Sequence, residues 1–235
     1  MTEVLELRQY TLHPGRRDTL IDLFDRELVE PQEAVGMRVY GQFRDLDDDD
    51  RFVWLRGFPD LASRAGALGA FYGGPVWRAH RDAANATMID SADVLLLRPA
   101  TPESGFDVPA ERRTRDATSL VTVTLYHLPP RAGDEFADLF LGEVAPLLAE
   151  TGAPPLACLR TDPAENNFPA LPIRAGENVF AWVAAFADQD AHLEHVRGLG
   201  RSTRWTHDLL PLVTKHLARP PEQLHLTPTA RSLLR

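Results

Sequence analysis

Alternating apolar and polar residues begin almost at the start of the chain and predict a β-strand at residues 3–12. A second alternating run, at residues 119–128, matches the first at a shift of 116 positions, so that Tyr10 falls on Tyr126. The match continues into the next segment, where both copies have the i, i+3, i+4, i+8 spacing of one apolar helical face. The pattern therefore predicts that a strand and the helix after it occur twice in the chain.

Aromatic residues extend the repeat beyond the first helix. At a shift of 128 positions a set of four aromatic residues recurs, and the four tryptophans form two pairs. These residues are Phe52, Trp54, Phe58 and Trp77, which fall on Phe180, Trp182, Phe186 and Trp205. The difference between the shifts of 116 and 128 indicates an inserted loop, which we place at about 162–178, in a segment rich in proline, asparagine and glycine.

Each copy is predicted to run strand, helix, strand, strand, helix, strand. In the first copy we expect strands at about 3–12, 36–46, 51–58 and 92–99, and helices at about 15–31 and 60–88 with a break at Gly73-Gly74-Pro75. In the second we expect strands at about 119–128, 155–161, 179–187 and 223–227, and helices at about 132–150 and 188–218. A βαββαβ unit is the ferredoxin-like arrangement, whose helices cover only one face of the sheet.

Two such units in one chain can bury their bare faces against each other. The sequence therefore predicts an α+β protein of two fused ferredoxin-like repeats, residues 1–100 and 119–235, joined by a linker at 101–118. The linker contains prolines and charged residues and has no apolar periodicity.

Three segments resemble a known family. Residues 6–15, E-L-R-Q-Y-T-L-H-P-G, are similar to the opening motif of NIPSNAP-family proteins, in which an E-L-R-x-Y strand runs into a Pro-Gly helix start. Residues 74–77 and the closing segment 224–232 are similar to that family as well. The second copy departs from the motif, because Thr122-Val123-Thr124 stands where E-L-R would be. The resemblance implies a dimeric α/β-barrel fold in a tandem form, and it assigns no reaction.

The first repeat places many polar side chains on one face of its sheet. Alternation puts these on the same face: Glu6, Arg8, Tyr10, Tyr40, Gln42, Arg44, Trp54 and Arg56. We expect this face to point at the second repeat, with Leu5 and Leu7 toward the helices. One interpretation is an ion-pair network centred on Glu6 that holds the repeats together. Another is a ligand cavity with polar groups among aromatic walls, and a solvent-exposed face is the third.

On the cavity interpretation, Arg8, Tyr10 and His80 are the candidate catalytic residues. An arginine would stabilise developing negative charge, and a tyrosine or histidine would move a proton. The candidate ligand-binding residues are Glu6, Tyr40, Gln42, Arg44, Trp54 and Arg56. His80, one helical turn after Trp77, equally fits a histidine on a helix surface.

The matching face of the second repeat is less polar. Thr124 and Ala184 stand where the first repeat has Arg8 and Arg56, so we predict a structural role for the second repeat and a site in the first. His192 and His195, spaced i, i+3, are interpreted as part of a solvated helix face.

Composition narrows the classes of function. A formal net charge of −9 argues against nucleic-acid and anionic-membrane partners. Cys158 is the only cysteine, which excludes an internal disulfide and a cysteine-based zinc site. No signal-peptide pattern and no membrane-spanning run is evident, so we expect a cytoplasmic protein. The nucleotide, serine-hydrolase and zincin motifs are absent, and we expect no cofactor and no metal.

The sequence therefore predicts a NIPSNAP-like protein that binds a small organic molecule in a polar and aromatic cavity of the first repeat. A cofactor-independent enzyme of monooxygenase, isomerase or cyclase type is the favoured form. The alternatives are a non-catalytic module that binds a metabolite or haem, and a structural or interaction protein. Exposed sheet edges would favour a homodimer.

Overall fold

The computed structural model describes residues 3–109, 111–112, 118–130 and 132–235. The linker expected at 101–118 falls partly outside these ranges. The first half contains β1 (Val4–Leu12), α1 (Arg17–Leu23), the π-helical segment η1 (Phe24–Leu28), α2 (Val29–Ala34), β2 (Arg38–Asp45), β3 (Arg51–Phe58), α3 (Leu61–Tyr72), α4 (Pro75–Asn85) and β4 (Met88–Pro99). The second contains β5 (Leu120–His127), α5 (Gly133–Leu139), η2 (Phe140–Val144), α6 (Ala145–Glu150), β6 (Ala157–Thr161), β7 (Val179–Phe186), α7 (Gln189–Arg201), η3 (Arg204–Leu209), α8 (Leu210–Lys215) and β8 (Glu222–Pro228).

The eight strands close into one barrel in the order β1-β3-β2-β8-β5-β7-β6-β4, and every pairing is antiparallel. Each half contributes four adjacent strands, and the halves meet at β2 with β8 and at β4 with β6. Trp54 lies opposite Arg8 on β1, and Trp182 lies opposite Thr124 on β5, so the two tryptophans occupy equivalent places. The predicted fold of two βαββαβ halves is confirmed.

Closure of the barrel changes one expectation. The homodimer was expected because sheet edges would be exposed, but each of the eight strands pairs on both sides. The argument for a dimer through edge pairing therefore no longer applies.

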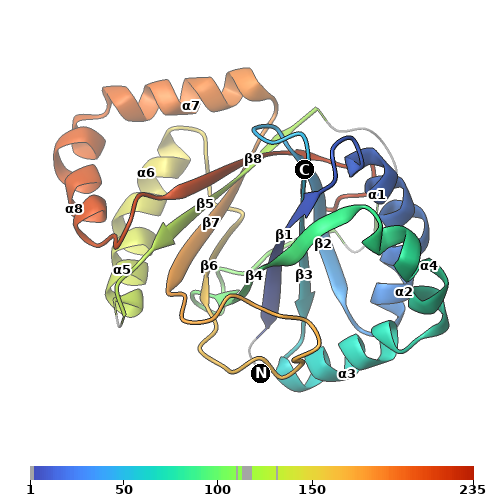
Figure 1. Cartoon of the computed structure of the whole chain (residues 1–235). Helices are drawn as coiled ribbons and strands as arrows, with labels where there is room; N and C mark the ends of the chain where they lie inside the picture. The colour runs from blue at the N-terminus through green and yellow to red at the C-terminus, as the bar shows by residue number, and fades with distance from the viewer. Residues whose placement is uncertain (1–2, 110, 113–117, 131) are drawn as a thin grey trace.

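Apolar side chains from both halves fill the inside of the barrel, and the helices cover its outside (Figure 1). The interior set includes Leu5, Leu7, Val53, Leu55, Leu95, Leu97, Val121, Val123, Leu125, Val183, Leu224 and Leu226. A separate core lies between the sheet and the helices in each half. The barrel therefore has three apolar layers, one inside and two outside.

The expected orientation of the strand faces was wrong. Leu5 and Leu7 point into the barrel, whereas Tyr10 and Trp54, with the polar residues of the same face, point at the helices of their own half. The physical reason is that apolar side chains fill the middle of the barrel, while the helix layer supplies Gln32 and Arg64, which bond to Arg56 and Glu6. Alternation separates the two faces of a strand, but it does not say which buried layer each face meets.

Tyr40 does not lie on the same face as Glu6 and Arg8, where alternation placed it, but points into the barrel. The pairing of β2 with β3 shifts by one residue between Val39 and Gly41, which is a β-bulge. Tyr40 therefore packs in the interior cluster, next to Phe106, and its hydroxyl donates a hydrogen bond to Glu3.

Local signals fix the helices that follow β3 and β7. The Asp60 and Asp188 carboxylates accept hydrogen bonds from the backbone N–H groups three residues on, at 2.7 and 2.9 Å, and so cap α3 and α7. Helix α3 ends before Gly73, where a Cβ would lie 2.8 Å from the Gly69 carbonyl oxygen, and Pro75 starts α4. The break predicted at this glycine pair is confirmed.

The segment between β6 and β7 reaches across to the first half and lies beside α3 (Figure 1). Phe168 and Leu171 pack against the helix-side core of that half. The Asn167 side chain donates to the Leu61 carbonyl and accepts from Arg64 at 2.7 Å. This segment therefore ties the two halves together outside the barrel. No helix of the described ranges is long and apolar enough to cross a bilayer.

Cys158 lies on β6 and is 3% exposed. Burial raises the pKa of its thiol to about 12, so the reactive thiolate is scarce at neutral pH. We expect Ellman's reagent to leave Cys158 unmodified in the native protein and to react fully in guanidinium chloride. Rapid reaction under native conditions would contradict this burial.

Candidate functional site

The polar cluster of the first half is an ion-pair network around Glu6. Its Oε2 atom accepts from Arg8 Nη1 at 2.6 Å and from Arg56 Nε at 2.8 Å, and its Oε1 atom accepts from Arg64 Nε at 2.7 Å. The four side chains are at most 1% exposed. Burial alone would raise the pKa of Glu6, but the three arginines outweigh burial and hold that pKa far below its usual range.

The structure brings some of the candidate residues together and separates others. Tyr10 accepts from Arg8 Nε at 3.0 Å, and Trp54 lies under the guanidinium groups of Arg8 and Arg56. The other four candidates lie apart from this network: Tyr40 contacts Glu3, Gln42 donates to Asp25, Arg44 pairs with Asp18, and His80 lies 3.7 Å from Glu27.

Three members of the network were missed in the sequence. Arg64 comes from α3, Gln32 from α2 and Tyr72 from the end of α3. Arg64 could have been found, because it shares one helical stripe with the buried residues Ala67, Leu68 and Phe71. A charged residue within an apolar stripe signals a buried partner.

The two halves differ greatly in the space between sheet and helices. A cavity of about 30 Å³ adjoins Tyr10, Gln32 and Trp54 in the first half, which is room for about one water molecule. A pocket of about 640 Å³ lies in the second half, a volume typical of small-molecule sites. Between sheet and helices, the ligand-sized space therefore lies in the second half and not in the first, where the sequence placed it.

The repeat explains this difference. Thr122, Thr124 and Ala184 occupy the positions that Glu6, Arg8 and Arg56 occupy in the first half. Three long charged side chains fill the first half, and three short ones leave the second half open. We predicted a structural role for the second repeat, but this half is the one with room for a ligand.

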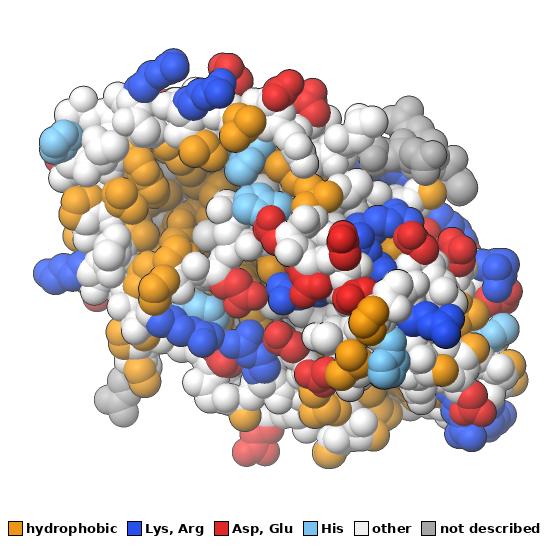
Figure 2. Space-filling view, turned by 45° about the horizontal axis from the view of Figure 1, so that its top comes forward, with side chains coloured by type: hydrophobic (Ala, Val, Ile, Leu, Met, Phe, Trp, Pro, Cys, Tyr) orange, Lys and Arg blue, Asp and Glu red, His pale blue; other side chains and the backbone are white. Residues whose placement is uncertain are grey.

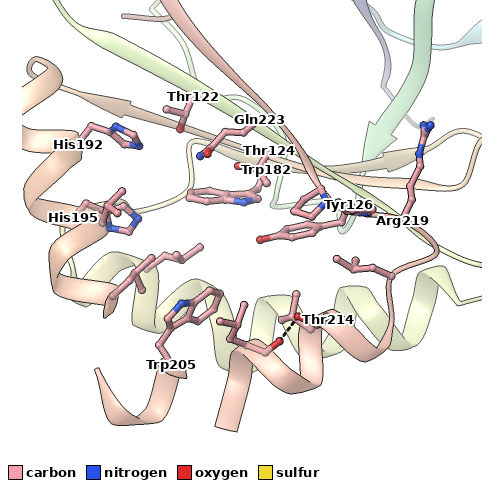
Figure 3. A pocket seen from close by; sticks show the side chains of 18 of the residues that line it. Thr122, Thr124, Tyr126, Trp182, His192, His195, Trp205, Thr214, Arg219 and Gln223 are labelled. Atoms are coloured by element: carbon pink, nitrogen blue, oxygen red, sulfur yellow. Dashed lines mark hydrogen bonds between the residues drawn. The ribbon is translucent and has the colours of Figure 1, made fainter. Parts of the chain in front are cut away.

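The pocket lies between the outer sheet face of the second half and the helices α7, η3 and α8. Figure 2 shows apolar side chains gathered in a hollow on this side of the molecule. Trp182 comes from the sheet, Trp205 from η3 and Phe186 from the end of β7, and all three line the pocket. In Figure 3 Trp182 and Trp205 lie on opposite walls. Such walls fit a flat apolar molecule.

His195, on α7, is 5% exposed and lines this pocket (Figure 3). Its Nδ1 atom lies 3.0 Å from Thr151 Oγ1 and 3.2 Å from the Thr151 carbonyl oxygen. The Thr151 carbonyl oxygen can only accept a hydrogen bond, so the proton lies on Nδ1, and the Thr151 hydroxyl, whose own hydrogen is directed at the Leu147 and Leu148 carbonyls, accepts from the same N–H. Nε2 then carries a lone pair and has no hydrogen-bond partner among the described residues.

The electrostatics of His195 favour a neutral ring. Burial lowers the pKa of His195, and the hydrogen bond to the Thr151 carbonyl offsets only part of this effect. The interpretation of His195 as a solvated residue is therefore wrong, because its helix face turns inward to the pocket.

Other polar groups reach the same pocket from the sheet. The Thr124 hydroxyl is buried without a hydrogen-bond partner among the described residues. Burial raises the pKa of Tyr126 to about 12, so its phenol keeps its proton and can donate it in a hydrogen bond. His192 also lines the pocket, and burial together with the neighbouring His225 and His195 lowers its pKa. In the part of the chain that the structure describes, no three acidic, histidine or cysteine side chains are grouped to hold a metal.

The fold is that of the dimeric α/β-barrel proteins, here with both barrel halves in one chain. Similar structures include a provisionally named monooxygenase from Fusobacterium nucleatum, with a TM-score of 0.63 and 10% identity over 97% of this chain and 92% of that one. Another, from Lactobacillus acidophilus, is provisionally named in the same way, with a TM-score of 0.60 and 11% identity over the full length of both chains. An anthrone oxidase-like protein has a TM-score of 0.64 and 13% identity over 97% and 92%.

The NIPSNAP family model matches residues 5–102, which lie in the first half and include the E-L-R-x-Y motif that predicted this resemblance. No curated protein matches the sequence.

Proposed function

We propose that the second half binds a small aromatic molecule and that His195 removes a proton from it, without a bound cofactor. The observation that carries this proposal is the neutral, unpartnered Nε2 atom of His195 in the wall of an aromatic pocket of about 640 Å³. A pocket of this size with a few polar groups is the usual form of a small-molecule site. The similar structures named as monooxygenases and as anthrone oxidase-like support the choice of an enzyme.

The side chains that line the pocket would have different roles in binding and catalysis. Trp182 and Trp205 would pack on the faces of a planar ring system. His195 Nε2 would accept the proton, which it can do because it is neutral above its lowered pKa. The hydroxyl groups of Tyr126 and Thr124 would donate hydrogen bonds to the negative oxygen that forms on the ligand.

The finer proposal concerns the oxidant. A carbanion formed at a benzylic CH₂ group can react with O₂, first forming a C–O bond. Cleavage of the O–O bond then gives a ketone and releases the second oxygen with both hydrogens as water. This reaction, CH₂ plus O₂ to C=O plus H₂O, balances without a bound cofactor. The N-terminal candidates Arg8, Tyr10 and His80 take no part in it.

Haem is the second candidate occupant. His195, whose Nδ1–H is held by the Thr151 carbonyl in the wall of the pocket, would hold the haem iron, which would supply redox chemistry there. Arg219, which lines the same pocket, would meet a propionate group. Titration with haemin distinguishes the two occupants, because binding through His195 would give a sharp Soret band that is lost in His195→Ala.

A pocket-filling variant tests the proposal. The Thr124→Phe substitution places a ring in the pocket beside Trp182, so we expect affinity for 1-naphthol and for anthrone to fall at least about tenfold. Quenching of tryptophan fluorescence during titration measures the dissociation constants. Leu193→Phe adds the same ring to an exposed position of α7 outside the pocket lining and should bind like the parent.

Two results would overturn the site. A parent protein that shows no saturable quenching with either compound would contradict binding of small aromatic molecules. Equal affinity in Thr124→Phe and the parent would place the ligand elsewhere.

A further inference from the structure

The ion-pair network of the first half has more positive than negative charges. Arg8, Arg56 and Arg64 form ion pairs with Glu6 and with no other carboxylate among the described residues. If all four side chains are charged, the network holds two uncompensated positive charges at most 1% exposed to solvent. Arg64 Nη2, moreover, is buried without a hydrogen-bond partner in the described chain. Uncompensated buried charge is costly, so a further negative group would be stabilising here.

A few hydrogen-bonding groups lie in the otherwise apolar wall of the small cavity beside this network. Tyr10, Gln32, Trp54 and Tyr72 line it, together with apolar side chains. Arg8 donates to the Tyr10 hydroxyl at 3.0 Å, and Arg56 Nη1 donates to the Tyr72 hydroxyl at 3.4 Å. Both hydroxyl oxygens thus accept from a cation, and neither donates a hydrogen bond within the described residues.

Trp54 adds an independent observation. Its side chain is 2% exposed, and its indole N–H is buried without an acceptor in the part of the chain that the structure describes. The guanidinium carbons of Arg56 and Arg8 lie 5.0 and 5.5 Å from its ring centre. An unsatisfied buried donor in a cavity wall points to an acceptor in the cavity.

We propose that this cavity binds one small monovalent anion of about the size of chloride. The Trp54 N–H and the hydroxyls of Tyr10 and Tyr72 donate to it, while Arg8 and Arg56 supply the compensating charge. The volume of about 30 Å³ excludes larger organic anions. A water molecule would satisfy the donors but would leave the excess charge unchanged. This site lies in the half opposite the proposed catalytic pocket and is independent of it.

Thermal melts test the site with chloride as the probe. Sodium gluconate is replaced stepwise by sodium chloride at constant sodium concentration and constant pH. We expect the melting temperature to rise saturably, by about 3–6 °C once chloride exceeds its dissociation constant tenfold. Bromide should act in the same way, and crystals grown in sodium bromide should show an anomalous peak between Tyr10, Trp54 and Tyr72.

Matched variants assign the effect to the cavity. Trp54→Phe and Tyr72→Phe each remove one donor and should reduce or abolish the chloride-dependent shift. Trp182→Phe, at the equivalent place in the other half, should keep it. Equal melting temperatures in gluconate and chloride would overturn the proposal, as would an equal loss of the shift in Trp182→Phe. A bromide peak without any chloride dependence of melting would indicate an adventitious ion only and would also overturn it.

Discussion

The Glu6→Leu variant should lose about 3–5 kcal/mol of unfolding free energy. The substitution leaves three buried guanidinium groups without their shared carboxylate, and none of them has another acidic partner among the described residues. Urea unfolding followed by circular dichroism measures the loss. Thr122→Leu, at the equivalent position of the second half, removes no ion pair and should change the free energy far less.

The arginines of the network should behave differently from Glu6. Arg8→Leu leaves Glu6 paired with Arg56 and Arg64 and lowers the excess positive charge, so its cost should be clearly smaller. The double variant Glu6→Leu/Arg8→Leu should recover only part of the Glu6→Leu loss, because two guanidinium groups stay unpaired. A Glu6→Leu variant as stable as the parent would contradict the network, and so would an equal cost for Arg8→Leu.

The pH dependence of this network has a definite sign. The pKa of Glu6 is lower in the folded chain than the value of about 4.5 expected in the unfolded chain, so the folded state binds fewer protons in acid. The contribution of Glu6 to stability is therefore fully present above about pH 4.5 and is lost as the pH falls further. The parent should lose more stability than Glu6→Leu between neutral pH and pH 3.

The second large effect concerns turnover. His195→Ala should lower kcat by about 10²–10⁴-fold, the usual contribution of a general base, while the dissociation constant for substrate changes little. Oxygen uptake with anthrone as substrate measures the rate. His207→Ala, an exposed histidine of η3, provides the control and should keep parental activity.

The pH profile distinguishes a base from a residue that only shapes the pocket. Because burial lowers the pKa of His195 below 6.5, the rate should be constant above about pH 6.5 and should fall in acid. His195→Ala should lose this acid limb along with the rate. An unchanged kcat in His195→Ala, or an acid limb that persists in it, would contradict the role of His195.

The elements and their duplication could be predicted because they depend on local patterns. Alternation predicted the strands, and the Gly-Gly-Pro sequence predicted the helix break before Pro75. The repeat predicted that Trp54 and Trp182 occupy equivalent positions in the two halves. The direction of the strand faces could not be predicted in the same way. Both faces of β1 are buried, one inside the barrel and one under the helices. Burial alone therefore does not show which face of the strand points into the barrel.

The candidate site shows a different limit. The residues that form the network around Glu6 were visible on the strands, but Arg64 comes from a helix and completes it from the opposite side. The pocket was missed because it forms where side chains of the second half are small. Thr124 and Ala184 do not stand out in the sequence as candidate functional residues. Only comparison with the equivalent Arg8 and Arg56 shows that these smaller side chains leave space for a pocket.

The closed barrel within one chain has an evolutionary consequence. In a symmetric dimer every mutation appears in both copies, so a change that fills one site fills the other as well. Fusion of the two halves removes that coupling, because each position of the repeat is encoded separately. Here one copy carries Glu6 and Arg8 and the other carries Thr122 and Thr124. Equivalent surfaces of the two repeats can therefore differ, and here one holds a buried ion-pair network and the other borders an open pocket.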